Sequence, residues 1–111
     1  MTKRVMKKKK SIILYINTSD NKKVEIALSI SGKKISKSVP NIWTTQLLLP
    51  LIDELLKTNK IGLTDLTEII VHEGPGSYTG LRVGIVVANT LSYFLKIPVN
   101  GKKDRSVVPK Y

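Results

Sequence analysis

The 111-residue sequence contains no cysteine and one histidine. Without cysteine, disulfides and thiolate metal sites are excluded, and one histidine leaves too few ligands for a zinc centre, so we expect no metal and no cofactor. No apolar run approaches the roughly 20 residues that cross a bilayer. The short run IILYI ends at Asn17 without the small residues of a signal-peptide cleavage site. These absences predict a single-domain, cytoplasmic protein with no membrane partner.

Acidic residues are also few: eight, against 19 lysines and arginines, for a net charge of +11. The first ten residues, MTKRVMKKKK, carry six of the basic residues and no acidic one. Such a segment attracts nucleic acid or an anionic membrane surface, and it equally suits a solvated, disordered extension. We predict a basic head (1–10), a folded lobe (11–100) and a basic tail (101–111). The candidate RNA contacts are Lys7, Lys8, Lys9, Lys10, Lys102, Lys103 and Arg105.

Three strands are predicted in the first part of the lobe. Residues 11–17 form a short apolar run with β-branched residues, and residues 23–30 alternate apolar and other side chains. A third, more exposed strand is expected at 34–39, after the turn SGKK. Tight turns between consecutive strands predict an antiparallel meander.

Two helices and two further strands are predicted after the meander. The leucine-rich segment 42–58 is too long for a strand, and a second helix is expected at 79–96. Between them, EIIVHE reads as a buried strand parallel to the first, and IPV (97–99) as a short fifth strand. The order strand-strand-strand-helix-strand-helix-strand predicts an α/β fold with a mixed five-stranded sheet.

The segment HEGPGSYTGLRVG (72–84) has four glycines where the fourth strand leads into the second helix. Pro75 and Gly76 predict a type II turn, and Ser77 or Thr79 can cap the helix. A phosphate-binding role is weakly supported, because the GxxxxGK[ST] and GxGxxG patterns are absent. A nucleophilic role for Ser77 is disfavoured too, since GxSxG is absent and His72 is the sole imidazole base. The candidate loop residues are Gly74, Pro75, Gly76, Ser77, Thr79 and Arg82.

Small residues recur every four positions along the second predicted helix, at Gly80, Gly84 and Ala88. This spacing places them on one face, where another backbone can approach closely. The rest of the helix is apolar almost all round, which is typical of a helix covered on more than one side. Either a partner protein or the first helix covers the small face. On the first alternative, Gly84→Leu would leave the monomer folded and abolish pairing.

The segment GPGSYTGLRVG closely resembles the GPGSFTGLR-G segment of the TsaB family, glycoprotease-like proteins of tRNA threonylcarbamoyl-adenosine biosynthesis. ILYINTS is similar to the family's opening strand and turn, and TTQLLLPLIDELL to its first helix, over roughly residues 12–99. The resemblance implies one lobe of an actin/hexokinase-like (ribonuclease H-like) fold.

The resemblance also implies a role without enzyme chemistry. TsaB proteins lack the metal-binding histidines of their catalytic partner TsaD and act as scaffolds. Their first two helices pair as a homodimer or as a TsaB–TsaD heterodimer, which works on tRNA with TsaE. The implied partners are therefore a TsaD-like enzyme or a second copy, a TsaE-like ATPase and tRNA. The implied interface residues are Trp43, Gln46, Leu47, Gly80, Leu81, Gly84 and Ala88.

Three departures from the family pattern matter. Asn17 replaces the aspartate of IDTS, Thr44 replaces a common histidine, and NGKKDRSVVPKY stands where a second lobe would begin. Nucleotide sites in this fold lie between lobes, so we expect a single-lobe, non-catalytic scaffold. A small basic RNA-binding protein and a truncated relic remain as alternatives. A hydrolase or ATPase is disfavoured because the sequence offers no assembled nucleophile, base and metal set.

Overall fold

The structure, a computed structural model, describes residues 11–20, 22–40, 44–102 and 106–110, without the side chains of residues 44–47 and 78. Several predicted contacts therefore lie outside the described residues or side chains: Lys7, Lys8, Lys9, Lys10, Trp43, Gln46, Leu47, Lys103 and Arg105.

The sheet has four strands in the order β3-β2-β1-β4. The predicted meander is confirmed: β1 (Ile12–Asn17), β2 (Lys23–Ile30) and β3 (Lys33–Pro40) pair antiparallel. Ser31 and Gly32 join β2 to β3 with positive φ angles of 51° and 89°, the geometry of a tight two-residue hairpin. β4 (Glu68–Val71) pairs parallel with β1, as predicted.

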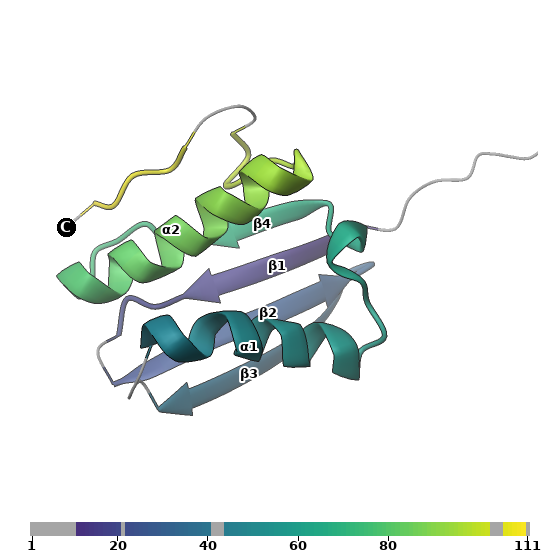
Figure 1. Ribbon diagram of the computed structural model, residues 1–111, viewed down its shortest axis with the longest axis horizontal. Helices are drawn as coiled ribbons and strands as arrows, with labels where there is room; N and C mark the ends of the chain where they lie inside the picture. Colours follow the sequence, from purple (N-terminus) through teal and green to yellow (C-terminus); the bar gives the residue numbers. More distant parts are fainter. Residues whose placement is uncertain (1–10, 21, 41–43, 103–105, 111) are drawn as a thin grey trace, which may run out of the picture.

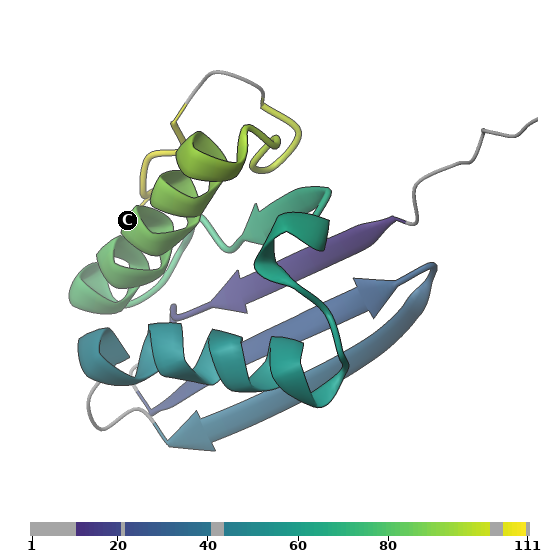
Figure 2. The same ribbon diagram turned by 45° about the vertical axis from the view of Figure 1, so that its right-hand side comes forward.

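Both helices cover the same face of this sheet, α1 (Thr44–Thr58) beside α2 (Tyr78–Leu95) (Figures 1 and 2). A single turn of 3₁₀ helix, Leu63–Asp65, lies between α1 and β4. Alternate residues of the strands point toward the helices and are buried, whereas the opposite face of the sheet carries no helix from the described part of the chain. The core between the layers is formed by Ile12, Leu14, Ile16, Val24, Ile26, Leu28, Leu48, Ile52, Leu55, Ile69, Leu81, Ile85 and Ala88.

The predicted fifth strand is wrong. Val99 makes only isolated bridges, parallel to Ile69 and antiparallel to Lys102. Pro98 has no N–H to donate to a ladder, and the backbone then leaves the extended region at Asn100 and Gly101, whose φ angles are 51° and 76°. The Asn100 side chain instead pairs with the backbone of Val71, through bonds of 2.8 and 2.9 Å. Two backbone bonds at Ile69, to Pro98 and from Asn100, and the Asn100 amide at Val71 together pair the edge of β4.

The parallel pairing brings the carboxyl ends of β1 and β4 to the same edge of the sheet. The turn after β1, residues 18–20, and the glycine loop after β4, residues 72–77, therefore lie together where α2 begins. This edge is where ligands bind in many open α/β sheets.

Candidate functional site

The glycine loop is built against the turn that follows β1. A side-chain carbon added at Gly76 would lie 2.5 Å from Ser19 Cβ, and the Ser77 N–H donates to the Ser19 carbonyl at 2.8 Å. One added at Gly80 would overlap the carbonyl oxygen of Thr18, whose hydroxyl donates to the Gly80 carbonyl at 2.5 Å. The glycines are thus required for close backbone approach at the edge where β1 and β4 end.

The face of α2 that carries the small residues packs inside the protein. Gly80 and Gly84 lie against Thr18, while Leu81 and Ala88 have no exposed surface. The prediction that Gly80, Leu81, Gly84 and Ala88 contact a partner is therefore wrong for this fold. The Thr18 carbonyl lies against Gly80, and the side chains of Thr18 and Ile16 lie against Gly84, so β1 and its turn, not α1, lie against these two glycines.

The predicted type II turn at Pro75 and Gly76 is also wrong. The positive φ angle in this loop, 139°, belongs to Gly74, and Gly76 has no positive φ. An added side-chain carbon at Gly74 would overlap the carbonyl oxygen of Lys110, a close approach that the sequence around the loop did not signal.

Ser77 is the N-cap of α2, as predicted, and its hydroxyl accepts from the Gly80 N–H at 3.3 Å. His72 does not form a nucleophile–base pair with it in the described hydrogen bonds. Its Nε2 lies 3.1 Å from the Pro75 carbonyl oxygen. Thr79 and Arg82 are exposed on the first turns of α2. The glycine loop therefore leads into α2 and supplies its N-cap.

Ser77→Ala is expected to lower the free energy of unfolding by about 1 kcal/mol, because one N–H at the helix start loses its acceptor. Thermal and urea unfolding measure this, with Thr79→Ala as the control at a neighbouring exposed position. An unchanged free energy of unfolding in Ser77→Ala would contradict the interpretation of Ser77 as a cap.

The first turn of the chain, Asn17 to Ser19, is closed by its own hydrogen bonds. The Asn17 side-chain oxygen accepts from the Ser19 N–H at 3.0 Å and from the Ser19 hydroxyl at 2.6 Å. This Asx turn uses the carbonyl of an amide, so the asparagine found in place of the family's aspartate keeps the turn without a charge.

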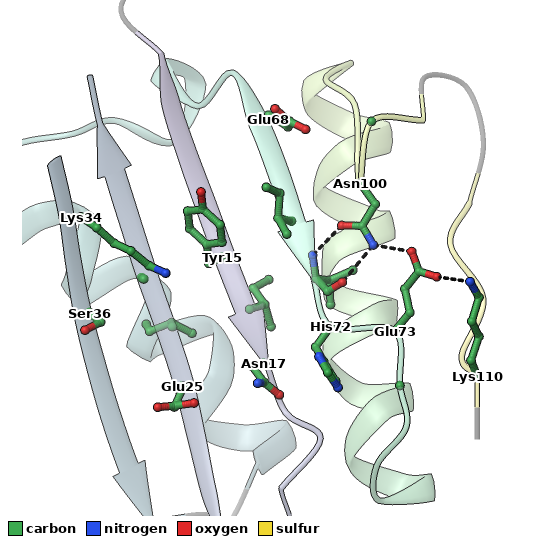
Figure 3. Close-up of a pocket in the computed structure, with 17 residues that line it drawn as sticks. Tyr15, Asn17, Glu25, Lys34, Ser36, Glu68, His72, Glu73, Asn100 and Lys110 are labelled. Atoms are coloured by element: carbon green, nitrogen blue, oxygen red, sulfur yellow. Dashed lines mark hydrogen bonds and ion pairs between the residues drawn. The ribbon is translucent and has the colours of Figure 1, made fainter. Parts of the chain in front are cut away.

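The helix-free face of the sheet is hollowed over a volume of about 1000 Å³ (Figure 3). Tyr15 lies at its centre on β1, and the Lys34 ammonium lies 4.5 Å from the Tyr15 ring centroid. Charges of both signs surround it, with carboxylates from Glu25, Glu68 and Glu73. Within the described part of the chain, no three histidine or acidic side chains gather as metal ligands.

Glu73 has the most interactions of the charged groups in this hollow. Asn100 Nδ2 donates to its carboxylate at 2.6 Å, and Lys110 Nζ lies 3.0 Å from the other oxygen (Figure 3). The Asn100 hydrogen bond, followed by the Lys110 hydrogen bond and the charges of Lys110 and Lys102, lowers the pKa of Glu73 below its ordinary value. No functional role for Glu73 was predicted from the sequence.

Because the folded-state pKa of Glu73 is lowered, its ionised form contributes stability above the ordinary value of 4.5, and this contribution is lost as the pH falls through the lowered pKa. Glu73→Gln should therefore reduce stability at pH 7 by about 1 kcal/mol, since Lys110 is exposed. The deficit should shrink as acid protonates wild-type Glu73. Unfolding curves across this pH range test this, with the exposed Glu25→Gln as control. A deficit independent of pH would contradict it.

The outer side of the helix layer exposes apolar side chains that the sequence interpretation missed. Leu49 on α1 is 54% exposed and Val86 on α2 is 60% exposed, and Tyr93 and Phe94 in the last turn of α2 are exposed as well. An apolar groove of about 400 Å³ opens beside Leu49, between α1, residues 61–63 and Leu91. The sequence did contain a signal for this exposed surface. The second predicted helix is apolar almost all round, and since only one face of a helix can lie on the sheet, some of its apolar side chains had to face outward.

Membrane insertion of these helices finds no support: neither helix in the described ranges is long and apolar enough to span a bilayer.

Comparison with known proteins identifies the same region. Residues 44–101, more than half of the chain, match the family model described as TsaD, tRNA N6-adenosine threonylcarbamoyltransferase. The chain is 37% identical over 100 residues to the tRNA threonylcarbamoyladenosine biosynthesis protein TsaB of Buchnera aphidicola subsp. Schizaphis graminum. That alignment covers 87% of this chain and 46% of the relative, so the chain spans less than half the relative's length.

Solved structures agree in fold. YeaZ from Pseudomonas aeruginosa superposes with a TM-score of 0.75 at 32% identity, over 80% of this chain and 41% of that one. A Bacteroides thetaiotaomicron protein with an actin-like ATPase fold gives 0.51 at 13% identity, over 80% and 32%. The predicted α/β class and actin-like resemblance are confirmed, with four strands in place of five.

Proposed function

This chain belongs to the TsaB family, and its residues 44–101 match the TsaD family model; on that premise we propose that it is a non-catalytic partner of a TsaD-like enzyme. Its task would be to support threonylcarbamoyl-adenosine modification of tRNA by pairing through its helix layer. The curated relatives named TsaB carry tRNA threonylcarbamoyladenosine biosynthesis in their names.

The observation that carries this proposal is the exposure of Leu49 and Val86 on neighbouring helices of one layer. Exposed branched apolar residues on a helix surface are costly in water and are typical of protein–protein contacts when they gather beside a groove. Leu49 lines such a groove. Because the small residues of α2 face inward, pairing would use the outer residues of the same helices.

Three features support a role without catalysis. The Ser77 hydroxyl serves as the helix cap, the Asn17 amide closes its own turn, and Thr18 is buried against Gly80. The polar groups at the edge where β1 and β4 end are thus committed to holding the loop and the turn together. We propose that catalytic groups come from the TsaD-like partner.

The test is reconstitution of tRNA modification. A TsaD-like enzyme and a TsaE-like ATPase from the same genome are incubated with unmodified tRNA and the threonylcarbamoyl-AMP donor, with and without this chain. Mass spectrometry of the nucleosides should find threonylcarbamoyl-adenosine only, or far more of it, when this chain is present. Equal modification in both reactions would contradict the proposal.

Direct contact with tRNA is a second part of the proposal, supported by the charge distribution. Lys33, Lys34 and Lys102 are exposed, and the sequence places six basic residues in 1–10. If the head neutralises phosphates, the logarithm of tRNA affinity should fall steeply with the logarithm of salt, and deleting 1–10 should make the slope shallower by about one per lost contact. Filter binding measures both slopes. Equal slopes would remove the head from the tRNA-binding surface.

A further inference from the structure

The segment 106–110 lies along α2, although it has no helix or strand of its own and lies beyond the family-matched residues 44–101 (Figures 1 and 2). The sequence predicted only a basic tail over residues 101–111. The structure instead gives this segment two separate anchors on the lobe, one on α2 and one on the glycine loop.

The first anchor is Val107. Its side chain is only 2% exposed, and it joins the hydrophobic core. Asn89 on α2 bonds both backbone groups of Val107: Nδ2 donates to the carbonyl at 2.9 Å, and Oδ1 accepts from the N–H at 2.9 Å. An amide side chain that pairs with both backbone groups of one residue holds an extended peptide as a neighbouring strand would.

The second anchor is Lys110. Its N–H donates to the Glu73 carbonyl at 2.7 Å, and its ammonium lies 3.0 Å from the Glu73 carboxylate. Its carbonyl oxygen fills the space where any side chain on Gly74 would be. The absence of a side chain at Gly74 therefore leaves room for the backbone of the docked segment.

We propose that Asn89, Glu73 and Gly74 form a peptide-binding groove, which this chain fills with its own residues 106–110. The groove recognises an extended peptide with a branched apolar residue followed three positions later by a lysine, the pattern of Val107 and Lys110. Main-chain bonds supply affinity, the core pocket for Val107 selects the apolar residue, and the Glu73 carboxylate selects the cation. This site is separate from the outer helix surface of Leu49 and Val86.

The test uses the full-length chain and an acetylated, amidated peptide, SVVPK. In the double variant Val107→Ala/Lys110→Glu, the tail loses both anchor side chains while the groove residues stay. The peptide should bind this variant saturably, shifting the NMR signals of the Asn89 side-chain amide. Binding to wild type should be at least about tenfold weaker, because the attached tail competes at a high effective concentration. A peptide carrying Val107→Asp is the matched control and should not bind.

Hydrogen exchange of the wild-type chain gives an independent readout, should the double variant fail to fold. The amides of Val107 and Lys110 should exchange faster than that of Leu14 in β1, because the tail opens without global unfolding. Equal exchange rates would make the segment an integral part of the core and overturn the proposal. So would a folded double variant whose Asn89 signals do not respond to the peptide. Neither outcome depends on pairing with a TsaD-like enzyme.

Discussion

Gly80→Ala, a change of one carbon, is expected to destabilise the protein by about 3 kcal/mol or more. The added carbon would overlap the carbonyl oxygen of Thr18, a backbone atom that cannot rotate away. Thr18 is held by the end of β1 on one side and by its hydroxyl bond to Gly80 on the other. Since small domains have a total stability of about 5–15 kcal/mol, a loss of this size would remove from about a fifth to more than half of it.

Urea unfolding followed by circular dichroism measures this loss, with Thr79→Ala as the control at the preceding, exposed position of α2. A Gly80→Ala variant as stable as the control would contradict the close packing of α2 on the β1 turn. Gly84→Leu should destabilise the protein as Gly80→Ala does, because the first carbon of the new side chain would overlap the Thr18 hydroxyl. The expectation from sequence, that Gly84→Leu spares the monomer, is therefore reversed.

The second large effect is expected at the outer helix surface. Leu49→Glu combined with Val86→Glu should weaken binding to the TsaD-like enzyme by at least about 100-fold while leaving the fold intact. Both side chains are more than half exposed, so the monomer loses little buried area. In an interface, each change would place an unpaired charge against apolar surface, and central contacts of this kind are typically worth about 2 kcal/mol each or more.

Titration calorimetry measures this binding, and Ser38→Glu is the matched control. Ser38 is exposed on β3, next to Lys37, which pairs with Glu54 of α1 on the helix side. Because neighbouring residues of a strand point to opposite faces, Ser38→Glu adds one negative charge on the side away from the helices, whereas the double variant adds one at each of two positions on the helix layer. If the double variant and Ser38→Glu bind with equal affinity, the helix layer is not the contact surface.

The sequence predicted the elements that depend on local patterns. Alternation of apolar residues identified the meander, and the serine before a long apolar segment identified the N-cap of α2. The fifth strand failed because its prediction followed the apolar pattern of IPV although Pro98 has no N–H for a ladder, and because the pattern says nothing of the turn at Asn100. A pattern of three residues is too short to carry that information.

The site was harder to predict because its contacts join distant segments. Four-residue spacing indicated a close backbone approach on this face, and the Thr18 carbonyl makes one at Gly80, whereas Gly84 is approached by the side chains of Thr18 and Ile16. The spacing could not tell that the neighbour would be Thr18, more than 60 residues away. The docking of Val107 on Asn89 leaves no periodic pattern at all. The resemblance to TsaB supplied the fold and the family, and the structure then moved the proposed contact surface to Leu49 and Val86.

The most direct measurement of the central claim is the mass of the complex. This 12.4 kDa chain is co-expressed with the TsaD-like protein of the same genome, purified, and passed through size-exclusion chromatography with light scattering. The account predicts one peak that contains both proteins, with the mass of a one-to-one or two-to-two complex. Separate elution of the two proteins, each at its own mass, would contradict the assignment of this chain as a partner of the enzyme.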